Sequence, residues 1–248
     1  MIRLKTAAEI ESMRRGGKIL GQILNELKLF TKAGISTKVI SEYADSLFEK
    51  FQVIPSFKGY NGFPASICVA QNNEVVHGIP GAKLIKEGDI VSIDCGVYLD
   101  SLHTDSAITF GVGKIPERSQ ILIQETARAL DLGISQVKPG NRLGDISHAI
   151  ESHLKKHKIT VISDLVGHGI GHDLHEEPQV PNEGKKGTGP ALKPGMVLAI
   201  EPITCLGNGK ITTLTDNWTI VTSDGSLSCQ QEHTVLVTTT GFEILTLA

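Results

Sequence analysis

Four acidic side chains stand where an acid is costly unless it has a partner. Asp94 and Glu201 each end an apolar run that predicts a strand, residues 90–93 and 196–200, and a buried carboxylate without a partner is strongly destabilising. Asp105 begins the return strand of the first run, and Glu232 precedes the corresponding strand of the second. Four such charges placed together near strand ends would repel one another unless cations balanced them. The pattern predicts a site for two divalent metal ions, although the four alone could be separate surface or salt-bridged acids.

An internal duplication favours the clustered arrangement. Residues 84–94 align without gaps on residues 191–201, which places Asp94 on Glu201 at an offset of 107. Lys32-Ala-Gly34 is likewise matched by Lys138-Pro-Gly140 at an offset of 106. Two matches at nearly one offset and in one order predict two α+β halves related by a pseudo-dyad. A site between the halves would collect carboxylates from each.

Three histidines could complete this site. His168 lies in Gly167-His-Gly-Ile-Gly171, where small neighbours let the backbone approach a ligand closely, and it is the natural fifth metal ligand. Carboxylates with one imidazole favour Mn, Fe(II), Co or Zn over metals that seek thiolates. His77 and His175 could each donate a hydrogen bond to a substrate beside the metals, although either alone is more often an ordinary packed or solvated histidine.

Other familiar catalytic motifs are absent. His168 and His172 have the spacing of the zincin histidines, but Gly169 stands where HExxH requires Glu. The sequence contains neither a GxSxG nucleophile elbow nor a GxxxxGK[ST] phosphate loop. These absences exclude the usual serine-hydrolase and nucleotide-binding interpretations.

The composition is that of a globular chain with a core of its own. Of its 248 residues, 40% are hydrophobic and 21% are charged. A chain of this length and composition can bury a stable apolar core without disulfide bonds. A net charge of −3 excludes strongly basic nucleic-acid or membrane binders. No apolar stretch of about 20 residues and no signal or transit peptide is readable, so we expect a cytoplasmic protein. Four widely spaced cysteines predict reduced core thiols: Cys68, Cys95, Cys205 and Cys229.

Periodicity predicts the elements that must position the candidate site. The capping box Thr6-Ala-Ala-Glu9 and an apolar stripe up to Gly34 predict a long first helix, and a second helix starts near Ser36 or Thr37. Two further helices are expected over residues 117–137 and 142–158. Strands are expected at residues 67–70, 90–94, 107–110, 196–201, 218–222 and 234–239. Three histidines beside lysines in the last helix are interpreted as a solvated face: His148, His153 and His157.

Taken together, the motifs resemble a known family, the type I methionine aminopeptidases, over essentially the whole chain. The resemblance rests on seven segments: Asn73-Glu-Val-Val-His-Gly-Ile-Pro80, Ile93-Asp94-Cys-Gly96, His103-Thr-Asp105-Ser106, Gly167-His-Gly-Ile-Gly171, His175-Glu-Glu-Pro178, Ala199-Ile-Glu-Pro202 and Gln230-Gln-Glu-His-Thr234. It implies the α+β, pseudo-two-fold pita-bread fold, in which helices cover antiparallel sheet. We therefore expect residues 1–248 to form a single catalytic domain of two halves without an N-terminal extension.

The resemblance also implies a role for each candidate site residue. Five residues would bind two divalent metal ions: Asp94, Asp105, His168, Glu201 and Glu232. A bridging water or hydroxide would attack the scissile carbonyl. Glu201 would accept the proton, His175 would stabilise the tetrahedral intermediate, and His77 would bind substrate and assist proton transfer.

Four residues match the family's pocket for the first side chain of the substrate: Tyr60, Phe63, Cys68 and Trp218. They could equally be plain core, but soft apolar walls suit an unbranched methionine side chain. Leu174 stands where many family members carry Phe, and His172 replaces a residue that is often basic. The expected reaction is removal of the N-terminal methionine from nascent proteins and peptides with a small second residue.

The expected partners follow from this role. The protein would act as a monomer on nascent polypeptide N-termini, with neither a membrane nor a specific nucleic-acid sequence as partner. The ribosome surface is a further candidate, because Arg14, Arg15 and Lys18 form a small basic stretch. Most such stretches are merely solvated helix faces.

Relatives with other activities fit the sequence less well. Type II methionine aminopeptidases carry a helical insertion, for which the 26 positions from His175 to Glu201 leave little room. Proline dipeptidases and aminopeptidase P usually have an additional N-terminal domain, and Asp94 comes too early for one. Two interpretations belong to another class. One is a protein- or peptide-binding module without metals, against which the five intact ligands and both histidines argue. The other is a protein whose metals are purely structural.

Overall fold

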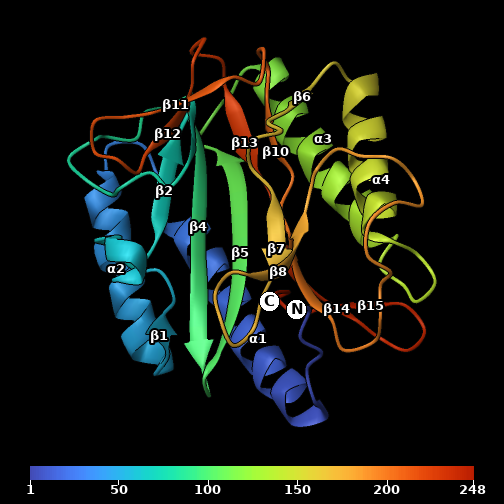
Figure 1. Ribbon diagram of the computed structural model, residues 1–248. Helices are drawn as coiled ribbons and strands as arrows, with labels where there is room; N and C mark the ends of the chain where they lie inside the picture. Colours follow the sequence, from blue (N-terminus) through green and yellow to red (C-terminus); the bar gives the residue numbers. More distant parts are fainter.

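A long antiparallel hairpin is the centre of the first half of the chain. In the computed structural model, which describes residues 1–248, β4 (Ile90–Leu99) and β5 (Leu102–Gly111) pair over their full length. The other edge of β4 pairs with β2 (Cys68–Gln71) and β1 (Ile54–Pro55). The helices α1 (Ala7–Phe30) and α2 (Thr37–Phe51) share one apolar core with these strands. In Figure 1, α1 runs behind β4 and β5.

The helix starts agree with the sequence prediction, and the end of the first helix does not. The Thr6 hydroxyl accepts a hydrogen bond from the backbone N–H of Glu9, and the Glu9 carboxylate accepts one from the backbone N–H of Thr6, which is the predicted capping box. The Ser36 hydroxyl caps α2. The helix α1 ends at Phe30 rather than near Gly34, because Thr31 adopts an extended conformation.

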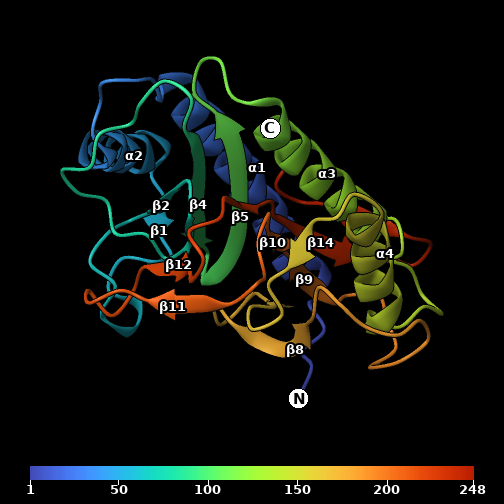
Figure 2. The same cartoon turned by 90° about the horizontal axis from the view of Figure 1, so that it is seen from above.

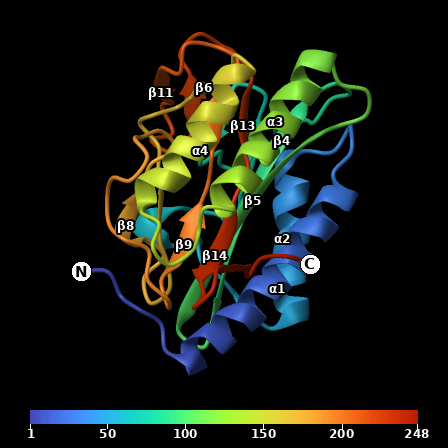
Figure 3. The ribbon, with the colours of Figure 1, turned by 90° about the vertical axis from the view of Figure 1, so that its right-hand side faces the viewer.

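The second half repeats the plan of two helices over a sheet. The helices α3 (Glu117–Ile134) and α4 (Leu143–Lys156) lie side by side (Figure 3). They share an apolar core with β9 (Val197–Ile200) and β14 (His233–Val237). The sheet has the order β15-β14-β9-β7-β8, completed by three strands: β7 (Gly167–Gly169), β8 (Glu176–Val180) and β15 (Phe242–Ile244).

Two small sheets and a short helix complete the chain. One sheet has the order β13-β10-β6, and the other has the order β11-β12-β3, which joins the two halves. Their strands are β3 (Glu74–Val76), β6 (Thr160–Val161), β10 (Ile203–Cys205), β11 (Ile211–Thr213), β12 (Ile220–Thr222) and β13 (Ser228–Gln230). The 3-10 helix η1 spans Tyr60–Gly62. In Figure 2, α1, α2 and α3 lie along one side of the strands, and β8 and β11 lie on the opposite side.

Backbone contacts recur at the offset seen in the sequence. Ser36 bridges to Leu84, and Arg142 bridges to Ala191 in the same antiparallel sense. Close by in the first half, the backbone N–H of Ile85 donates to the Ile35 carbonyl. In the second half, the backbone N–H of Leu192 donates to the Asn141 carbonyl. These positions differ by 106 and 107 residues. The recurrence supports the inference that the halves are copies of one unit.

Two further observations bear on the class of protein. All four cysteines are buried and free, as the sequence predicted. None of the helices is both long enough and apolar enough to span a membrane.

Candidate active site

One cavity of about 280 Å³ lies between residues of the two halves. All eleven residues that the sequence analysis proposed for the site line it: Tyr60, Phe63, Cys68, His77, Asp94, Asp105, His168, His175, Glu201, Trp218 and Glu232. The folded chain therefore brings together residues that are up to 172 positions apart in sequence.

Asp94 and Asp105 reach the cavity from the middle of the β4–β5 hairpin. The register places Asp105 opposite Gly96, two residues beyond Asp94, so both carboxylates lie on one face of the hairpin. The prediction that they lie at strand ends is wrong. The strand β4 continues to Leu99 because the alternation that buries Val91 and Ile93 against the helices continues through Cys95 and Val97. That alternation is visible in the sequence, but the charge at its centre interrupts the apolar run.

Glu201 and Glu232 do lie at strand ends, as predicted. Glu201 directly follows β9, Glu232 directly precedes β14, and the register pairs their neighbours Ile200 and His233. The two carboxylates are therefore adjacent across one strand pair.

Hydrogen bonds join the acidic residues of the two halves. The backbone N–H of Asp105 donates to the Thr234 hydroxyl over 2.9 Å, and this hydroxyl donates to the Asp105 carbonyl over 2.7 Å. The Ser106 hydroxyl donates to the Glu232 carbonyl over 2.6 Å, and the N–H of Glu232 donates to the Ala107 carbonyl over 2.9 Å. The hairpin of the first half thus fixes Glu232 beside Asp105.

His168 presents an unprotonated nitrogen to the acidic residues. It sits on β7, and its Nδ1–H donates to the Gly169 carbonyl over 2.9 Å. Its Nε2 lies 3.6 Å from Oε1 of Glu201. Burial, with a smaller effect of His175, lowers the pKa of His168 to about 3, so the ring is neutral at neutral pH. A Cβ on Gly169 would lie 2.3 Å from the Glu177 carbonyl, which explains the glycine beside the histidine.

Electrostatics and hydrogen bonding both show that the acidic cluster lacks counter-charge. Burial raises the pKa of Asp94 to about 7. Burial and the neighbouring carboxylates raise the pKa values of Asp105, Glu201 and Glu232 well above their usual range. Three buried carboxylate oxygens accept no hydrogen bond: Oδ1 of Asp94, Oδ1 of Asp105 and Oε1 of Glu232.

These residues fit divalent metal ions. Ligand atoms of Asp105, His168 and Glu232 lie within 4.8 Å of one another, and a set of carboxylates with one imidazole suits Mn, Fe(II), Co or Zn. Cations would use the unpaired oxygens and lower the raised pKa values.

Gln230 is a site residue that the sequence analysis did not single out. Its Nε2 donates to Oδ2 of Asp94 over 3.4 Å and to Oε2 of Glu201 over 3.3 Å, and the side chain lines the cavity. It lies at the end of β13 and opens the segment Gln230-Gln-Glu-His-Thr234 that the family resemblance rests on, which is the signal that could have found it. Further lining residues outside that proposed set are Phe57, Asn61, Val76, Leu165, Val166, Leu174 and Ile203.

Apolar and aromatic side chains line the other part of the cavity. The rings of Phe63 and Trp218 meet edge to face, with centroids 5.1 Å apart. Cys68 on β2 lies opposite Asp94 in the register, so it marks the boundary between apolar and acidic surface. The predicted strand over residues 218–222 is shorter than expected, because β12 begins only at Ile220 and Trp218 stays in the preceding turn.

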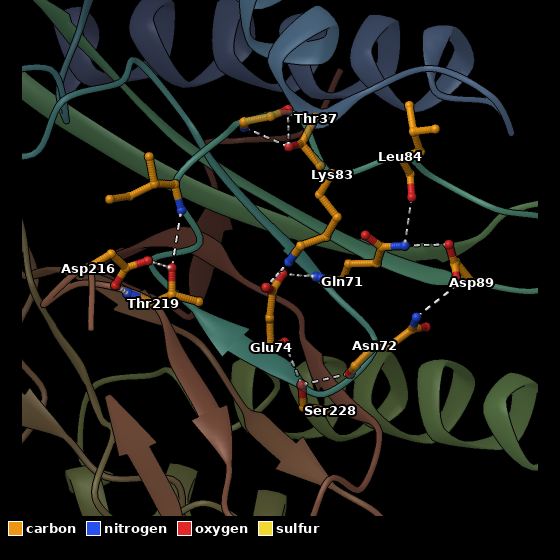
Figure 4. Close-up of polar contacts among 12 residues, drawn as sticks. Thr37, Gln71, Asn72, Glu74, Lys83, Leu84, Asp89, Asp216, Thr219 and Ser228 are labelled. Carbon is orange, nitrogen blue, oxygen red and sulfur yellow. Dashed lines mark hydrogen bonds and ion pairs between the residues drawn. The ribbon is translucent and has the colours of Figure 1, made fainter. Parts of the chain in front are cut away.

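Polar contacts hold the segments next to His77 and Trp218, and Figure 4 shows those of Glu74 with Lys83 and of Asp216 with Thr219. Before His77, the Glu74 carboxylate pairs with Lys83. The Asp216 carboxylate accepts hydrogen bonds from the backbone N–H of Trp218 and from the backbone and hydroxyl of Thr219. Both aromatic segments are therefore fixed by acids outside the cavity.

His175 is held by a separate set of contacts. Its Nδ1 lies 2.9 Å from the Tyr60 hydroxyl, and its ring centroid lies 4.3 Å from that of His168. The adjacent Glu176 carboxylate accepts backbone N–H groups of the turn before His175 and pairs over 2.7 Å with Lys5, whose side chain is 1% exposed. Desolvation lowers the pKa values of both rim histidines, His77 and His175.

Comparison with known proteins gives consistent similarity over the full chain. A model of metallopeptidase family M24 matches residues 11–239. Methionine aminopeptidase 1 of Bacillus subtilis is 49% identical over 246 residues, with 99% of each chain covered. A methionine aminopeptidase of Clostridium perfringens is 49% identical over 247 residues, covering 100% of this chain and 99% of the relative. The crystal structure of methionine aminopeptidase from Thermotoga maritima superposes with a TM-score of 0.98 at 44% identity, and each chain is covered completely.

Proposed function

The chain belongs to metallopeptidase family M24 and has its pita-bread fold, and from this we propose that it is a methionine aminopeptidase of the type I class, which removes the N-terminal methionine from proteins and peptides. The observation that carries the proposal is a single cavity with two chemically different parts. Four buried carboxylates and a neutral histidine lie in one part, and apolar and aromatic side chains lie in the other.

We assign two divalent metal ions to the acidic part. Their ligands would be Asp94, Asp105, His168, Glu201 and Glu232, and three unpaired buried oxygens among them support this assignment. The bound ions would polarise the scissile carbonyl and supply an activated water at neutral pH.

The protein's own groups would then bind the substrate and move protons. The Glu201 carboxylate would take up the proton that the attacking water releases. The Tyr60 hydroxyl, by donating to Nδ1 of His175, would leave Nε2–H of that ring as a donor toward the developing oxyanion. Because its pKa is lowered, His175 is neutral at neutral pH, so it acts as a hydrogen-bond donor without requiring a charge. His77, on the same cavity, would orient the substrate and assist proton transfer.

The apolar part would select the first side chain. Phe63, Cys68 and Trp218 offer soft walls to an unbranched thioether. One methylene in such a pocket changes discrimination by only about 1–3 kcal/mol, so selectivity against leucine must come from branching and shape. The side chain of the substrate's second residue would lie beside the metals and His77. A large side chain there would keep the scissile carbonyl from its reactive position. We therefore expect the protein to prefer peptides whose second residue is Gly, Ala or Ser.

The proposed setting is the processing of nascent chains by a monomer in the cytoplasm. Ion pairs within the chain weaken the case for a ribosome contact through the basic stretch of α1. Arg14 pairs with Glu243, and Arg15 pairs with Asp100. Only Lys18 of the stretch has no ion-pair partner.

Turnover by metal-stripped enzyme, with Mn, Fe(II), Co or Zn added back, tests this function. The substrates are Met-Ala-Ser, Leu-Ala-Ser, Met-Leu-Ser and Gly-Pro. We expect metal-dependent cleavage of the first and little of the others. Equal rates on the first two would contradict the methionine pocket, and cleavage of Gly-Pro alone would indicate a proline dipeptidase. No turnover with any metal would favour a binding module.

A further inference from the structure

A second group of potential metal ligands lies outside the cavity, between α3 and α4. Glu125 comes from α3, and His153 and His157 come from the end of α4. Oε2 of Glu125 lies 2.7 Å from Nε2 of His153 and 3.3 Å from Nε2 of His157. The potential ligand atoms of the three residues all lie within 4.8 Å of one another. None of the three residues lines the cavity.

The sequence prediction of a solvated histidine face is wrong for part of this helix. His148 is exposed, as predicted. The His153 side chain is only 15% exposed, because it turns toward Glu125 on the neighbouring helix. The helix spacing alone could not reveal this contact, since Glu125 lies 28 residues earlier in the chain.

Helix geometry orients the two imidazoles together. Residues four apart lie on the same face of a helix, and the rings of His153 and His157 have centroids 4.8 Å apart. His157 is the C-cap residue of α4. The carbonyl groups at a helix C-terminus favour nearby positive charge, so this end of α4 suits a cation.

We propose that Glu125, His153 and His157 bind one divalent transition metal ion, with Zn²⁺ the best match. Two imidazole nitrogens and one carboxylate oxygen are ligands that Zn²⁺ takes in tetrahedral sites, with water in the fourth position. The partial exposure of His157, whose side chain is 37% exposed, leaves room for that water. The ion links α3 to α4 and adds to the stability of the second half without entering the reaction.

The alternative is a hydrogen bond alone. In that case one imidazole N–H donates to Glu125, and no ion is needed. The two cases differ in what removal of His157 does, because the hydrogen bond of His153 to Glu125 survives it while the set of three ligands does not.

The test counts Zn²⁺ bound per chain. Wild type, His157→Gln and the control His148→Gln are dialysed against buffered Zn²⁺, and protein-bound zinc is measured by elemental analysis. We expect His157→Gln to bind one equivalent fewer than wild type and His148→Gln to bind the same number. Ions in the cavity contribute equally to all three proteins, so the difference reports only the helix site.

A second measurement tests whether the ion stabilises the folded chain against unfolding. At a free Zn²⁺ concentration about 100 times the dissociation constant, an ion that binds only the folded chain raises the folded-to-unfolded ratio about 100-fold. The urea midpoint of wild type and His148→Gln should therefore rise further with Zn²⁺ than that of His157→Gln. If His157→Gln fails to fold, Glu125→Gln takes its place in both measurements.

Equal zinc content in wild type and His157→Gln, or in its replacement, would overturn the proposal. So would an equal loss in His148→Gln, which would indicate nonspecific binding along α4. Cleavage of Met-Ala-Ser serves only as a check on folding, and loss of the proposed peptidase function would leave the zinc count unaffected.

Discussion

The acidic residues of the cavity lie on paired strands or directly beside them. The residues at its rim lie in loops or on a short 3-10 helix: Tyr60, His77, His175 and Trp218. Asp94 and Asp105 belong to a hairpin that pairs over ten residues on each strand. Tyr60 lies on a 3-10 helix, Trp218 lies in a turn, and His77 has a positive φ of 57°. The acidic part is thus positioned by regular pairing, and the rim is positioned by individual polar contacts.

This contrast assigns different tasks to the two regions. Strand pairing tolerates little displacement, which suits a cluster of like charges that would otherwise separate. The rim depends on three acids outside the cavity, Glu74, Glu176 and Asp216, each of which fixes one segment. Loss of a residue in the acidic part should abolish the reaction, whereas loss of a rim support should weaken it by degrees.

The largest effect is expected for Asp94→Asn, which should abolish metal-dependent cleavage of Met-Ala-Ser while the chain still folds. The variant loses a ligand charge, but the apolar cores of the two halves do not include this side chain. Turnover and far-UV circular dichroism measure the two outcomes. Ile93→Val, a buried change in the apolar core on the same hairpin, is the control for hairpin packing. Near-normal turnover in Asp94→Asn would contradict the metal assignment.

The same substitution should stabilise the metal-free chain at alkaline pH. Burial raises the pKa of Asp94 to about 7 in the folded state from an ordinary value of 3.8. A raised pKa contributes stability that is complete below pH 3.8 and is lost as pH rises through 7. Asp94→Asn removes this loss, because the amide does not ionise. Urea unfolding in chelator should show a gain at pH 8 that shrinks toward pH 4, and a gain independent of pH would show that ionisation of Asp94 is not its cause.

The next largest effect is expected for His175→Ala, with kcat lowered roughly 10²-fold and metal content unchanged. The side chain faces the cavity but is not one of the five assigned ligands. Steady-state kinetics measures kcat, and elemental analysis measures the metal content. Tyr60→Phe, which removes only the hydroxyl next to Nδ1, should lower kcat less. A fall in metal content that parallels activity would make His175 a ligand or a support for one.

A buried ion pair should matter less to the reaction but more to stability. Lys5→Met removes the close partner of the Glu176 carboxylate, whose side chain is 4% exposed, and leaves only Arg3 at 4.0 Å. Breaking a buried pair costs up to about 3–5 kcal/mol. Displacement of the turn before His175 should also lower kcat about 10-fold. Urea unfolding and kcat are the measurements.

Two controls identify the cause in Lys5→Met. Lys5→Met with Glu176→Gln removes the buried charge and should recover stability but not kcat. Lys38→Met breaks an exposed pair with Glu42 and should cost less than about 1 kcal/mol. If Lys5→Met kept full kcat, the pair would have no part in positioning His175.

Sequence patterns predicted the acidic region better than its supports. The duplication and the apolar runs identified all four carboxylates, because a charge after an apolar strand is a local signal. The predicted hairpin is still too short, since Asp94 interrupts the run that Cys95 and Val97 continue. Glu201 and Glu232 at strand ends were predicted correctly.

The supports of the rim could not be predicted in this way. Lys5 and Glu176 are 171 residues apart and have no shared period. The pair of Glu125 with His153 depends likewise on how two helices meet. A single sequence carries no signal for such contacts, because they follow from packing between the halves or between helices.

The smallest effect is expected for Asp216→Ala, which should raise KM for Met-Ala-Ser about fivefold and leave kcat nearly unchanged. Asp216 lies outside the cavity and accepts the backbone N–H groups of Trp218 and Thr219. Without it the turn must be ordered when substrate binds, at a cost of about 1 kcal/mol. Asp224→Ala is the matched control, because Asp224 accepts the N–H groups of Asn208 and Ser226 in a turn away from the cavity. A lower kcat with unchanged KM would show that this turn positions reacting groups rather than the methionine pocket, and the contrast between the two regions would then fail at Trp218.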